Sequence, residues 1–487
     1  METYQDHDMI SLAGLVARAE VHPRELLDIA LERMARVNPV LNAVVHDFRE
    51  VAFNHVAITS SDGARAPLWG VPFLLKDMGA EAIDFPASLG SRLLANTQFK
   101  MNSTIYDRLS ASGLVIFGRT AAPEGGIGAA TEAAIYGGAT RNPWDLALSP
   151  GGSSGGSGAA VAAGIVPAAH GSDGGGSIRI PAANCGLLGF KPTRAMVPDG
   201  PYAGEGWAGM AIEGFLTRSV RDTALLLDLV CGPDLGSPYV APQMQTSFMQ
   251  AIEHPVKPLK IALCDTTLTG GAIHPDCKQA VASAASLLAD MGHDIIPARP
   301  QADTNAMMQA WTKIVACGTA LWVRNALLRL GRDLQQGDIE GVARGAVAYA
   351  KTISGADYLE AVEMIHAYGR QMAVFFENYD ILLSPTLAEP PPKIGRFAHT
   401  TEDYVAYRTG SDGIFAHAPF TAAFNASGQP AVSIPLHWNS AGLPIGVHLA
   451  ARFGADTQLM ALCAELERAR PWFNHVPTVA GVDDEKA

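Results

Sequence analysis

The chain carries two glycine-rich stretches near its middle, GGSSGGS at residues 151–157 and GSDGGGSIRIPAANCG at residues 171–186. Stretches rich in glycine and serine are most often flexible linkers, and composition alone leaves that interpretation open. Apolar runs at residues 159–169, 178–183 and 187–190 lie among them without the polar residues of a linker. Because glycine permits positive φ and a close approach of backbone to backbone or ligand, the pattern favours a packed functional loop.

Two serines within these stretches are candidate nucleophiles. Ser153 and Ser177 are flanked by small residues, which would leave their hydroxyl groups sterically open. The backbone amides of Gly174, Gly175, Gly176 and Ser177 can converge on a developing oxyanion. A serine hydroxyl is too weak an acid to ionise unaided at neutral pH, so a serine nucleophile requires a base.

Two side chains are candidates for that base. His170 is the only histidine inside the segment, although a single histidine beside apolar residues is more often structural. Lys76 closes the apolar run GVPFLLKD at residues 70–77, where burial would favour the neutral amine and lower its pKa. A surface lysine at the end of a strand is the alternative interpretation, so the residues alone leave the base open.

The composition is that of a globular chain of enzyme size. The 487 residues are 48% hydrophobic and 17% charged, which excludes a disordered chain. With 35 Lys and Arg against 48 Asp and Glu, the formal net charge is −13. This balance argues against a broad surface for nucleic acid or anionic membranes. The longest apolar stretch, residues 159–169, is about half the length of a membrane span, so neither partner is expected.

The cysteine and histidine patterns predict a reduced protein without a metal. No two of the six cysteines lie within four residues of each other, which is untypical of metal sites and of disulfide scaffolds. The first ten residues, METYQDHDMI, lack the basic start and apolar run of a signal peptide. We therefore expect a cytoplasmic protein with no metal and no cofactor, because phosphate-loop and metalloprotease motifs are also absent.

Hydrophobic periodicity predicts alternating helices and strands. This alternation predicts an α/β fold in which helices cover a central sheet. The run over residues 11–53 indicates two helices, with Asn38-Pro39 as punctuation. The other predicted helices cover residues 103–112, 276–291, 306–329, 343–379 and a C-terminal segment, and the predicted strands cover residues 70–76, 114–118, 260–264, 381–383, 432–435 and 445–450.

Taken together, these motifs resemble the amidase signature family. Its signature pairs GGSSGGS with a GTDxGGSIRxPA block and an upstream GxPxxxKD, and all three parts stand here in order. GATRNPWD at residues 138–145, GFKPTR at 189–194 and GLPIGVHL at 442–449 extend the similarity over nearly the whole chain. The resemblance implies the amidase-signature fold, a central mixed twisted sheet with helices on both faces.

The resemblance also implies a single domain, residues 1–487. Within it, N-terminal helices are expected at residues 1–65, the catalytic signature core at 66–235, a variable substrate-shaping region at 236–400, and a return to the core at 401–487.

The resemblance also implies a mechanism. Ser177 matches the nucleophile that forms an acyl-enzyme, and Lys76 matches the general base. Ser153 matches the serine on a cis peptide bond that relays the proton between them. The oxyanion hole maps to the amides of residues 174–177. Asp173 and Arg179 match charged positions that support this loop, either as a structural ion pair or in contact with substrate.

Departures from the family pattern bear on the substrate. Ser172 replaces the usual Thr, and Gly174 replaces Thr or Ile. Ile180 stands where tRNA-dependent amidotransferase subunits of the family commonly carry Gln, which argues against such a subunit. The motifs look most like a bacterial subgroup with 6-aminohexanoate-cyclic-dimer hydrolases and urethane-cleaving amidases. This subgroup implies a small amide, cyclic amide or carbamate as substrate, with a homodimer left open.

Three alternatives remain beside this interpretation. A partner-dependent glutaminase-type amidotransferase subunit and an inert binding protein would share the fold. Residues 152–156 also fit the G-x-S-x-G nucleophile elbow with Ser154 as nucleophile, but that elbow needs a preceding strand where the sequence predicts a loop.

The substrate pocket is expected to draw on residues 125–130, 202–210 and 311–322. Within these ranges Gly125, Ile127 and Cys317 are the candidate contacts. Trp311 and Trp322 share one predicted helix face, as an aromatic core stripe or as a pocket wall.

Overall fold

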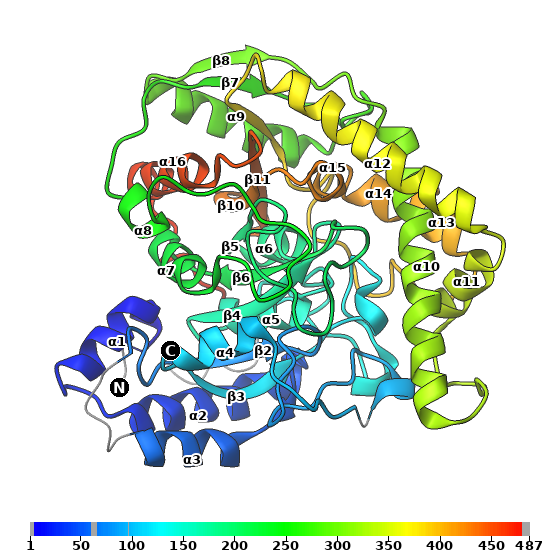
Figure 1. Cartoon of the computed structure of the whole chain (residues 1–487). Coiled ribbons are helices and arrows are strands. Elements are labelled where there is room, and N and C mark those ends of the chain that lie inside the picture. Colours follow the sequence, from blue (N-terminus) through cyan, green and yellow to red (C-terminus); the bar gives the residue numbers. More distant parts are fainter. Residues whose placement is uncertain (1–3, 60–65, 96, 480–487) are drawn as a thin grey trace.

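The computed structural model describes residues 4–59, 66–95 and 97–479 (Figure 1). Within these residues a single 11-stranded sheet runs through the molecule. Its strands are β1 (Val44–Asp47), β2 (Pro72–Lys76), β3 (Val115–Thr120), β4 (Ala168–Asp173), β5 (Leu188–Lys191), β6 (Ile212–Thr217), β7 (Lys260–Leu263), β8 (Asp294–Pro297), β9 (Ile381–Pro385), β10 (Ala431–Trp438) and β11 (Pro444–Ala451). Their order across the sheet is β1-β3-β2-β4-β6-β5-β10-β11-β9-β7-β8.

The sheet is mixed. β2 is parallel to β3 and β4, and β7 is parallel to β8 and β9. The other neighbouring pairs, such as β4 with β6 and β10 with β11, are antiparallel. β2 and β11 are buried along their whole length, as expected where both faces of a sheet are covered. The predicted α/β architecture is confirmed.

Helices cover both faces. Leu74 of β2 joins one apolar core, while its neighbours Phe73 and Leu75 join another, because successive side chains of a strand point to opposite faces. The core of Phe73 includes α1 (Met9–Ala17), α4 (Thr104–Ala111), α7 (Val220–Val230), α8 (Phe248–Ala251), α9 (Pro275–Asp290) and α16 (Asp456–Ala469). The core of Leu74 includes α2 (Pro23–Leu41), α3 (Arg49–Thr59), α5 (Gly155–Ala162) and α6 (Arg179–Cys185).

A third core lies toward the other end of the sheet. Leu382 of β9 packs there with α10 (Thr304–Leu330), α12 (Gly355–Phe375) and α15 (Thr421–Ser427). α11 (Gly341–Ala350) and α13 (Tyr404–Thr409) pack against α10, and α14 (Ile414–His417) follows α13 (Figure 1). Short 3-10 turns complete the described elements: Tyr4–Asp6, Arg92–Leu94, Glu124–Gly126 and Ala134–Tyr136.

The glycine-rich segment is packed structure, so the linker interpretation is wrong. Every residue of α5 is buried. A side chain at Gly156 would collide with the backbone of Ala121 and Ala43, so glycine is needed for α5 to pack this closely on β3 and β1. The segment continues through β4 into α6 without an exposed stretch.

Two predicted helical regions differ from the structure. Residues 11–53 include strand β1 and the start of a third helix, and Pro39 lies inside α2. Pro39 falls in the last turn, where it removes one N–H from the helical ladder but only two helical residues follow it. The predicted 343–379 helix is divided into α11 and α12, because Ser354 and Asp357 form a capping box that starts α12.

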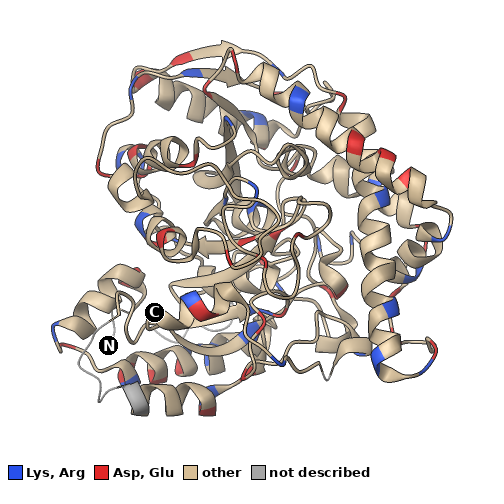
Figure 2. Cartoon of the chain, viewed as in Figure 1, with Lys and Arg blue, Asp and Glu red and all other residues tan. Residues whose placement is uncertain are grey.

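Strands from all four expected segments share the one sheet: β1, β2–β6, β7–β9 and β10–β11. Residues 1–3, 60–65, 96 and 480–487 of those segments lie outside the described residues, and the boundaries themselves stay a prediction. In the view of Figure 2, basic and acidic residues are interspersed over the outer helices. No helix within the described ranges is both long enough and apolar enough to span a bilayer.

Candidate active site

Lys76 brings a completely buried amine to the glycine-rich loops. It is the last residue of β2, and its relative exposure is 0%. β2 and β4 are parallel, so their carboxyl ends meet at one edge of the sheet. There the Lys76 Nζ lies 2.7 Å from Ser153 Oγ and 2.9 Å from Ser172 Oγ. Ser153 and Ser172, both far from Lys76 in the sequence, therefore contact the same buried amine.

The environment of Lys76 favours its neutral form. Burial lowers the pKa of Lys76 from its ordinary 10.5 to about 8, although the charges of Glu213 and Asp173 act in the opposite direction. Burial also raises the pKa of Glu213. A buried amine loses the hydration of its charged form, so the uncharged amine that a general base requires is accessible near neutral pH.

His170 occupies a supporting position behind Lys76. Its Nδ1 accepts the backbone N–H of Lys76 over 3.3 Å, and its Nε2 lies 2.7 Å from Glu213 Oε2. Since Nδ1 is an acceptor, the proton belongs on Nε2, which donates to Glu213. Burial lowers the pKa of His170 to about 3, so the ring is neutral. His170, the alternative base from the sequence, therefore holds the backbone of Lys76 at the end of β2.

Ser153 lies in a tight backbone turn. The Gly152–Ser153 peptide is cis. A side chain at Gly152 would lie 2.8 Å from Ala130 N and from Gly128 O, which is closer than any Cβ is found, so only glycine fits. The Ser153 side chain is buried next to Lys76.

Ser154 is a structural serine rather than the nucleophile of an elbow. Its N–H donates to the carbonyl of Ser177 over 3.1 Å, and its hydroxyl bonds to the backbone of Ser172. Residues 142–150, which precede it, form turns and isolated bridges instead of a strand. The backbone bond places Ser177 beside the 151–157 stretch. Within the described residues no hydrogen bond is recorded for the Ser177 hydroxyl itself.

The 174–177 loop is held by its carbonyl groups. Trp311 Nε1 donates to Gly174 O over 3.1 Å. In a trans peptide the C=O of one residue and the N–H of the next point in opposite directions. The bond from α10 therefore directs the N–H of Gly175 to the other side of the loop, where it is available to an oxyanion.

The next peptide units are held in the same way. The N–H of Ile180 donates to Gly176 O over 2.7 Å, which leaves the N–H of Ser177 on the opposite side. The N–H of Gly176, in contrast, donates to Asp173 Oδ1 over 2.6 Å, and Thr421 holds the carbonyl of the same peptide unit. Of the expected oxyanion donors, Gly176 is therefore already engaged.

Asp173 and Arg179 form the buried anchor of this loop. Both are fully buried, with Arg179 Nη2 2.9 Å from Asp173 Oδ1 and Nε 3.0 Å from Oδ2. Asn425 donates to the Asp173 carbonyl and side chain and accepts from Arg179. Burial by itself favours the neutral acid, but the Arg179 charge and these bonds hold the pKa of Asp173 well below its usual range. The pair thus supports the loop instead of facing the cavity beside it.

Ser177 borders a small cavity of about 20 Å³, which has room for about one water molecule. Its walls are aromatic and apolar apart from one arginine. Trp311 packs edge-to-face on Trp207 and Phe415, with ring centroids 5.6 and 5.3 Å apart. The lining residues are Gly126, Gly128, Ala129, Gly175, Ser177, Ile180, Trp207, Trp311, Arg408, Ile414, Phe415 and Ala418.

The three expected substrate contacts do not line this cavity. Gly125 lies against Trp322, Ile127 belongs to an apolar core, and Cys317 is partly buried on α10. Their contact with substrate stays a prediction. Trp207 and Trp311 lie in the ranges that the sequence singled out.

Arg408 and Phe415, from α13 and α14, were missed. The segment AYRTG around Arg408 carries no motif that marks it.

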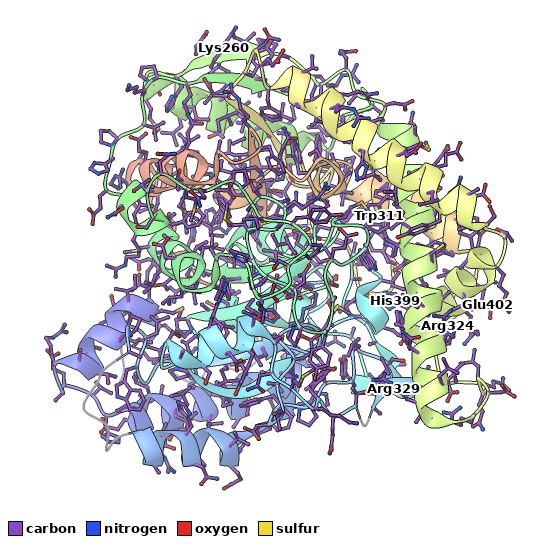
Figure 3. All side chains as sticks on the ribbon, in the orientation of Figure 1. Lys260, Trp311, Arg324, Arg329, His399 and Glu402 are labelled. Atoms are coloured by element: carbon purple, nitrogen blue, oxygen red, sulfur yellow. The ribbon has the colours of Figure 1, made fainter. Side chains whose placement is uncertain are left out.

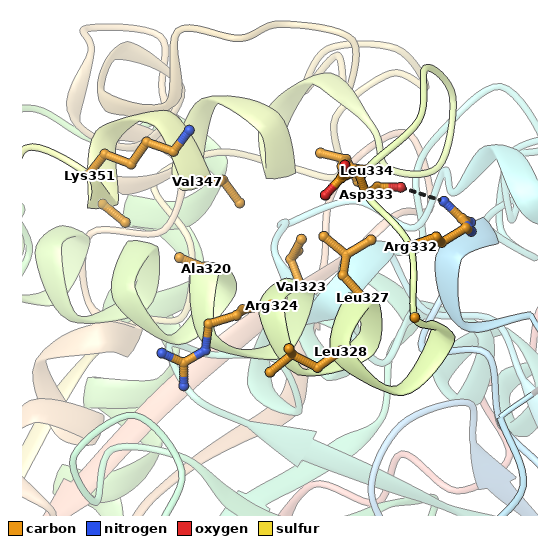
Figure 4. A pocket seen from close by; sticks show the side chains of 12 residues that line it. Ala320, Val323, Arg324, Leu327, Leu328, Arg332, Asp333, Leu334, Val347 and Lys351 are labelled. Carbon is orange, nitrogen blue, oxygen red and sulfur yellow. Dashed lines mark hydrogen bonds between the residues drawn. The ribbon is translucent and has the colours of Figure 1, made fainter.

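A larger cavity of about 760 Å³ lies between α10, α11 and the loop that follows α10 (Figure 4). Leu327 and Leu328 form part of its apolar wall, and Arg324 and Lys351 stand at its border. It shares no lining residue with the Ser177 cavity and contains none of the candidate catalytic groups. Across the described ranges, no cluster of three or more His, Cys, Asp or Glu side chains is arranged to hold a metal ion.

Comparison with known proteins agrees with this geometry. Residues 25–460 match the amidase family. The chain belongs to the amidase signature family. It is 35% identical over 479 residues to the 6-aminohexanoate-cyclic-dimer hydrolase of Paenarthrobacter ureafaciens, with 96% of each chain covered. It is 33% identical over 471 residues to an acylamidase of Rhodococcus erythropolis, again with 96% of each chain covered.

The fold of this amidase matches a solved structure of 6-aminohexanoate cyclic dimer hydrolase complexed with substrate. The TM-score is 0.90 at 33% identity, covering 98% of this chain and 100% of that chain. The resemblance inferred from the motifs is confirmed, and the protein is an amidase, a hydrolase of C–N bonds. The interpretation as an inert binding protein is set aside.

The buried Asp173–Arg179 pair should contribute strongly to the free energy of unfolding of the amidase. Asp173→Asn is expected to lower the free energy of unfolding at pH 7 by about 3–5 kcal/mol, because it leaves Arg179 buried without a counter-charge. Since the folded state depresses the pKa of Asp173, this contribution is present above the unfolded pKa and is lost as pH falls through the folded pKa.

Urea denaturation at pH 7 and at acid pH measures both expectations. Asp265→Asn is the matched control, because Asp265 pairs with Lys278 at the surface over 3.4 Å and should change stability by less than about 1 kcal/mol. Equal effects of the two substitutions would contradict the anchoring role.

Proposed function

We propose that this amidase cleaves the C–N bond of a small non-peptide amide, cyclic amide or carbamate through an acyl-enzyme on Ser177. The neutral amine of Lys76 takes a proton from Ser153 while Ser153 takes one from Ser177. The Ser177 oxygen attacks the carbonyl carbon, and the relay then runs backward to protonate the leaving amine. Water attacks the resulting ester with the same base, releasing the acid and restoring Ser177.

The observation that carries this proposal is the 2.7 Å contact between Lys76 Nζ and Ser153 Oγ in a buried site. A lysine on the protein surface would be protonated at neutral pH and would serve only as a charge. Here burial lowers the pKa of Lys76 to about 8, close to the pH at which a general base is most effective.

The oxyanion hole is proposed to consist of the N–H groups of Gly174, Gly175 and Ser177. The carbonyl preceding each of them is held by a donor from another part of the fold or loop. Fixed donors need no reorganisation when negative charge develops on the carbonyl oxygen, which is the main advantage of such a site over water.

The substrate class follows from the cavity and the relatives together. The aromatic walls beside Ser177 are a surface that an apolar acyl or amine group would contact, and the cavity of about 20 Å³ must widen to admit it. The relatives named above are a cyclic-dimer hydrolase and an acylamidase, both named for small amides. We extend this class to carbamates, which present the same carbonyl carbon to the nucleophile.

The location and assembly of the enzyme are also proposals. The six cysteines are free thiols, which supports a reducing cytoplasm. We propose that the chain needs no partner other than a second copy of itself, since the relatives named above, a cyclic-dimer hydrolase and an acylamidase, are not named as subunits of a larger enzyme. Sedimentation of the purified chain would distinguish a monomer from a homodimer.

A substrate panel tests the reaction. The purified chain alone is given an aryl anilide, an aliphatic primary amide, 6-aminohexanoate cyclic dimer and an aryl carbamate. We expect hydrolysis of at least one, and intact mass after rapid quenching should show the acyl group attached to the protein. Inactivity on the whole panel would contradict the proposal and direct attention to a partner-dependent amidotransferase subunit.

A further inference from the structure

Arg408 is a buried cation in the wall of the Ser177 cavity. It lies on α13 with a relative exposure of 3%. Its guanidinium carbon is 4.9 Å from the ring centroid of Trp311 and 5.5 Å from those of Tyr404 and Tyr407. Figure 3 places Trp311 on the side of α10 that faces the interior. The charge therefore sits in an aromatic enclosure next to the nucleophile.

This cation has no anionic partner among the described residues. No ion pair is recorded for it there, and its Nε and Nη2 are buried without a hydrogen-bond partner. The nearby carboxylates of Glu132 and Glu340, whose charges add to burial in raising the pKa of Tyr407, form hydrogen bonds with other groups. Glu132 accepts the N–H of Gly395, and Glu340 accepts that of Ala134. Stacking on aromatic faces offsets part of the lost hydration of a guanidinium. Arg408 also has a side-chain hydrogen bond with Tyr404, but Nε and Nη2 remain without an acceptor.

A second observation concerns two residues behind Gly128, outside the lining of the cavity. A side chain on Gly128, a lining residue, would lie 3.1 Å from Tyr407 Oη and 3.0 Å from His399 Nε2. Both of these atoms are also buried without a partner. The His399 Nδ1 faces Glu340 at 3.2 Å, which leaves Nε2 as the free side of the ring. Buried polar atoms are nearly always paired. Of Arg408, Tyr407 and His399, only Arg408 lines the cavity itself, so its unpaired Nε and Nη2 are the donors that indicate a missing ligand.

We propose that Arg408 binds a carboxylate on the substrate. The planar fork of a guanidinium matches the two oxygens of a carboxylate, which a neutral amide or an alkyl group cannot replace. The enzyme would then prefer amides that carry a carboxylate away from the scissile bond. This inference rests on the proposed acyl-enzyme function, because it assigns the substrate class of that same cavity.

Two matched substrate pairs test the preference. On the acyl side, adipic acid monoanilide is compared with the anilide of adipic acid monoamide. On the amine side, N-hexanoyl-4-aminobenzoate is compared with N-hexanoyl-4-aminobenzamide. Within each pair a carboxylate is replaced by a carboxamide of nearly the same shape. We expect the wild type to favour the carboxylate about 10- to 100-fold in kcat/KM in one pair, which also identifies the side that Arg408 contacts.

Variants link the preference to the guanidinium. In Arg408→Met the ratio between the paired substrates should fall to about one, and Arg408→Lys should restore part of it because it keeps a charge but not the fork. Arg324→Met is the control, since Arg324 is exposed in the other cavity and should keep the wild-type ratio. A structural role of Arg408 would lower activity on both members of a pair equally. An unchanged ratio in Arg408→Met, or no carboxylate preference in either pair, would overturn the proposal.

Binding separates this inference from the proposed reaction. Calorimetric titration of Ser177→Ala with the paired anilides and benzoates measures affinity without turnover. Tighter binding of the carboxylate member that is lost in the Ser177→Ala, Arg408→Met double variant supports Arg408 even if no hydrolysis is found. Equal affinities for both members would overturn it, even if the acyl-enzyme reaction is established.

Discussion

Ser177→Ala is expected to lower kcat/KM on any accepted substrate by about 10,000-fold and to abolish the acyl adduct in intact mass. The substitution removes the only atom that forms the covalent bond, and what remains is binding and the oxyanion donors. The backbone bond from Ser154 to the carbonyl of residue 177 does not depend on the side chain. The fold should therefore survive, and the melting temperature should stay close to that of the wild type.

Ser154→Ala is the matched control for this loss. Ser154 belongs to the neighbouring 151–157 stretch and is fully buried, but its hydroxyl bonds only to the Ser172 backbone over 3.3 Å. We expect its kcat/KM to stay within about tenfold of the wild type, because such a bond contributes about 1 kcal/mol. If Ser154→Ala is inactive and Ser177→Ala retains activity, the nucleophile is wrongly assigned.

Lys76→Met should lower kcat/KM by about 1,000-fold, the usual scale for losing a general base. Methionine is of similar length and fills the buried space of the Lys76 side chain, but it accepts no proton. Lys76→Arg should be inactive as well, because a guanidinium keeps its proton at every pH used for enzymes. Activity in Lys76→Arg would show that the site needs a positive charge and not a base, which would contradict the mechanism.

The wild-type pH profile is a second measurement on the same residue. Only the neutral amine accepts a proton, so kcat/KM should rise with pH and level off, with a midpoint near the pKa of about 8. Below that midpoint the rate should fall tenfold per pH unit, since the fraction of neutral Lys76 does so. A rate that falls as pH rises from 7 to 9 would exclude a neutral lysine base.

Much of the fold could be predicted from local patterns. The apolar run before Lys76 marked β2, and the periodic run at residues 306–329 marked α10 to within two residues. The division between α11 and α12 was missed although the sequence carries its signal, the Ser354 and Asp357 capping box. Strand β1 was missed because its four residues lie between two helices and only one of them is fully buried.

The order of the strands could not be predicted from such patterns. β5 pairs with β10 and β6 although more than 200 residues separate β5 from β10. Pairing of this kind depends on which hydrophobic faces fit together over the whole sheet, and local periodicity carries no record of it.

The sequence by itself determined Lys76, Ser153 and Ser177 as candidate catalytic residues, because all three lie in motifs that resemble the amidase signature. Without that resemblance, Lys76 and His170 both remained open as the base. Only the tertiary structure decided what surrounds the three residues. Parallel pairing of β2 with β4 brings Lys76 beside Ser172. The bonds of Ser154 to the Ser172 backbone bring Ser153 to the same amine. α10 and α13 bring Trp311 and Arg408 to the nucleophile. Desolvation, charge pairing and orphaned donors are properties of an enclosed volume, so the pKa of Lys76 and the carboxylate preference proposed for Arg408 arise only when distant segments close around the site.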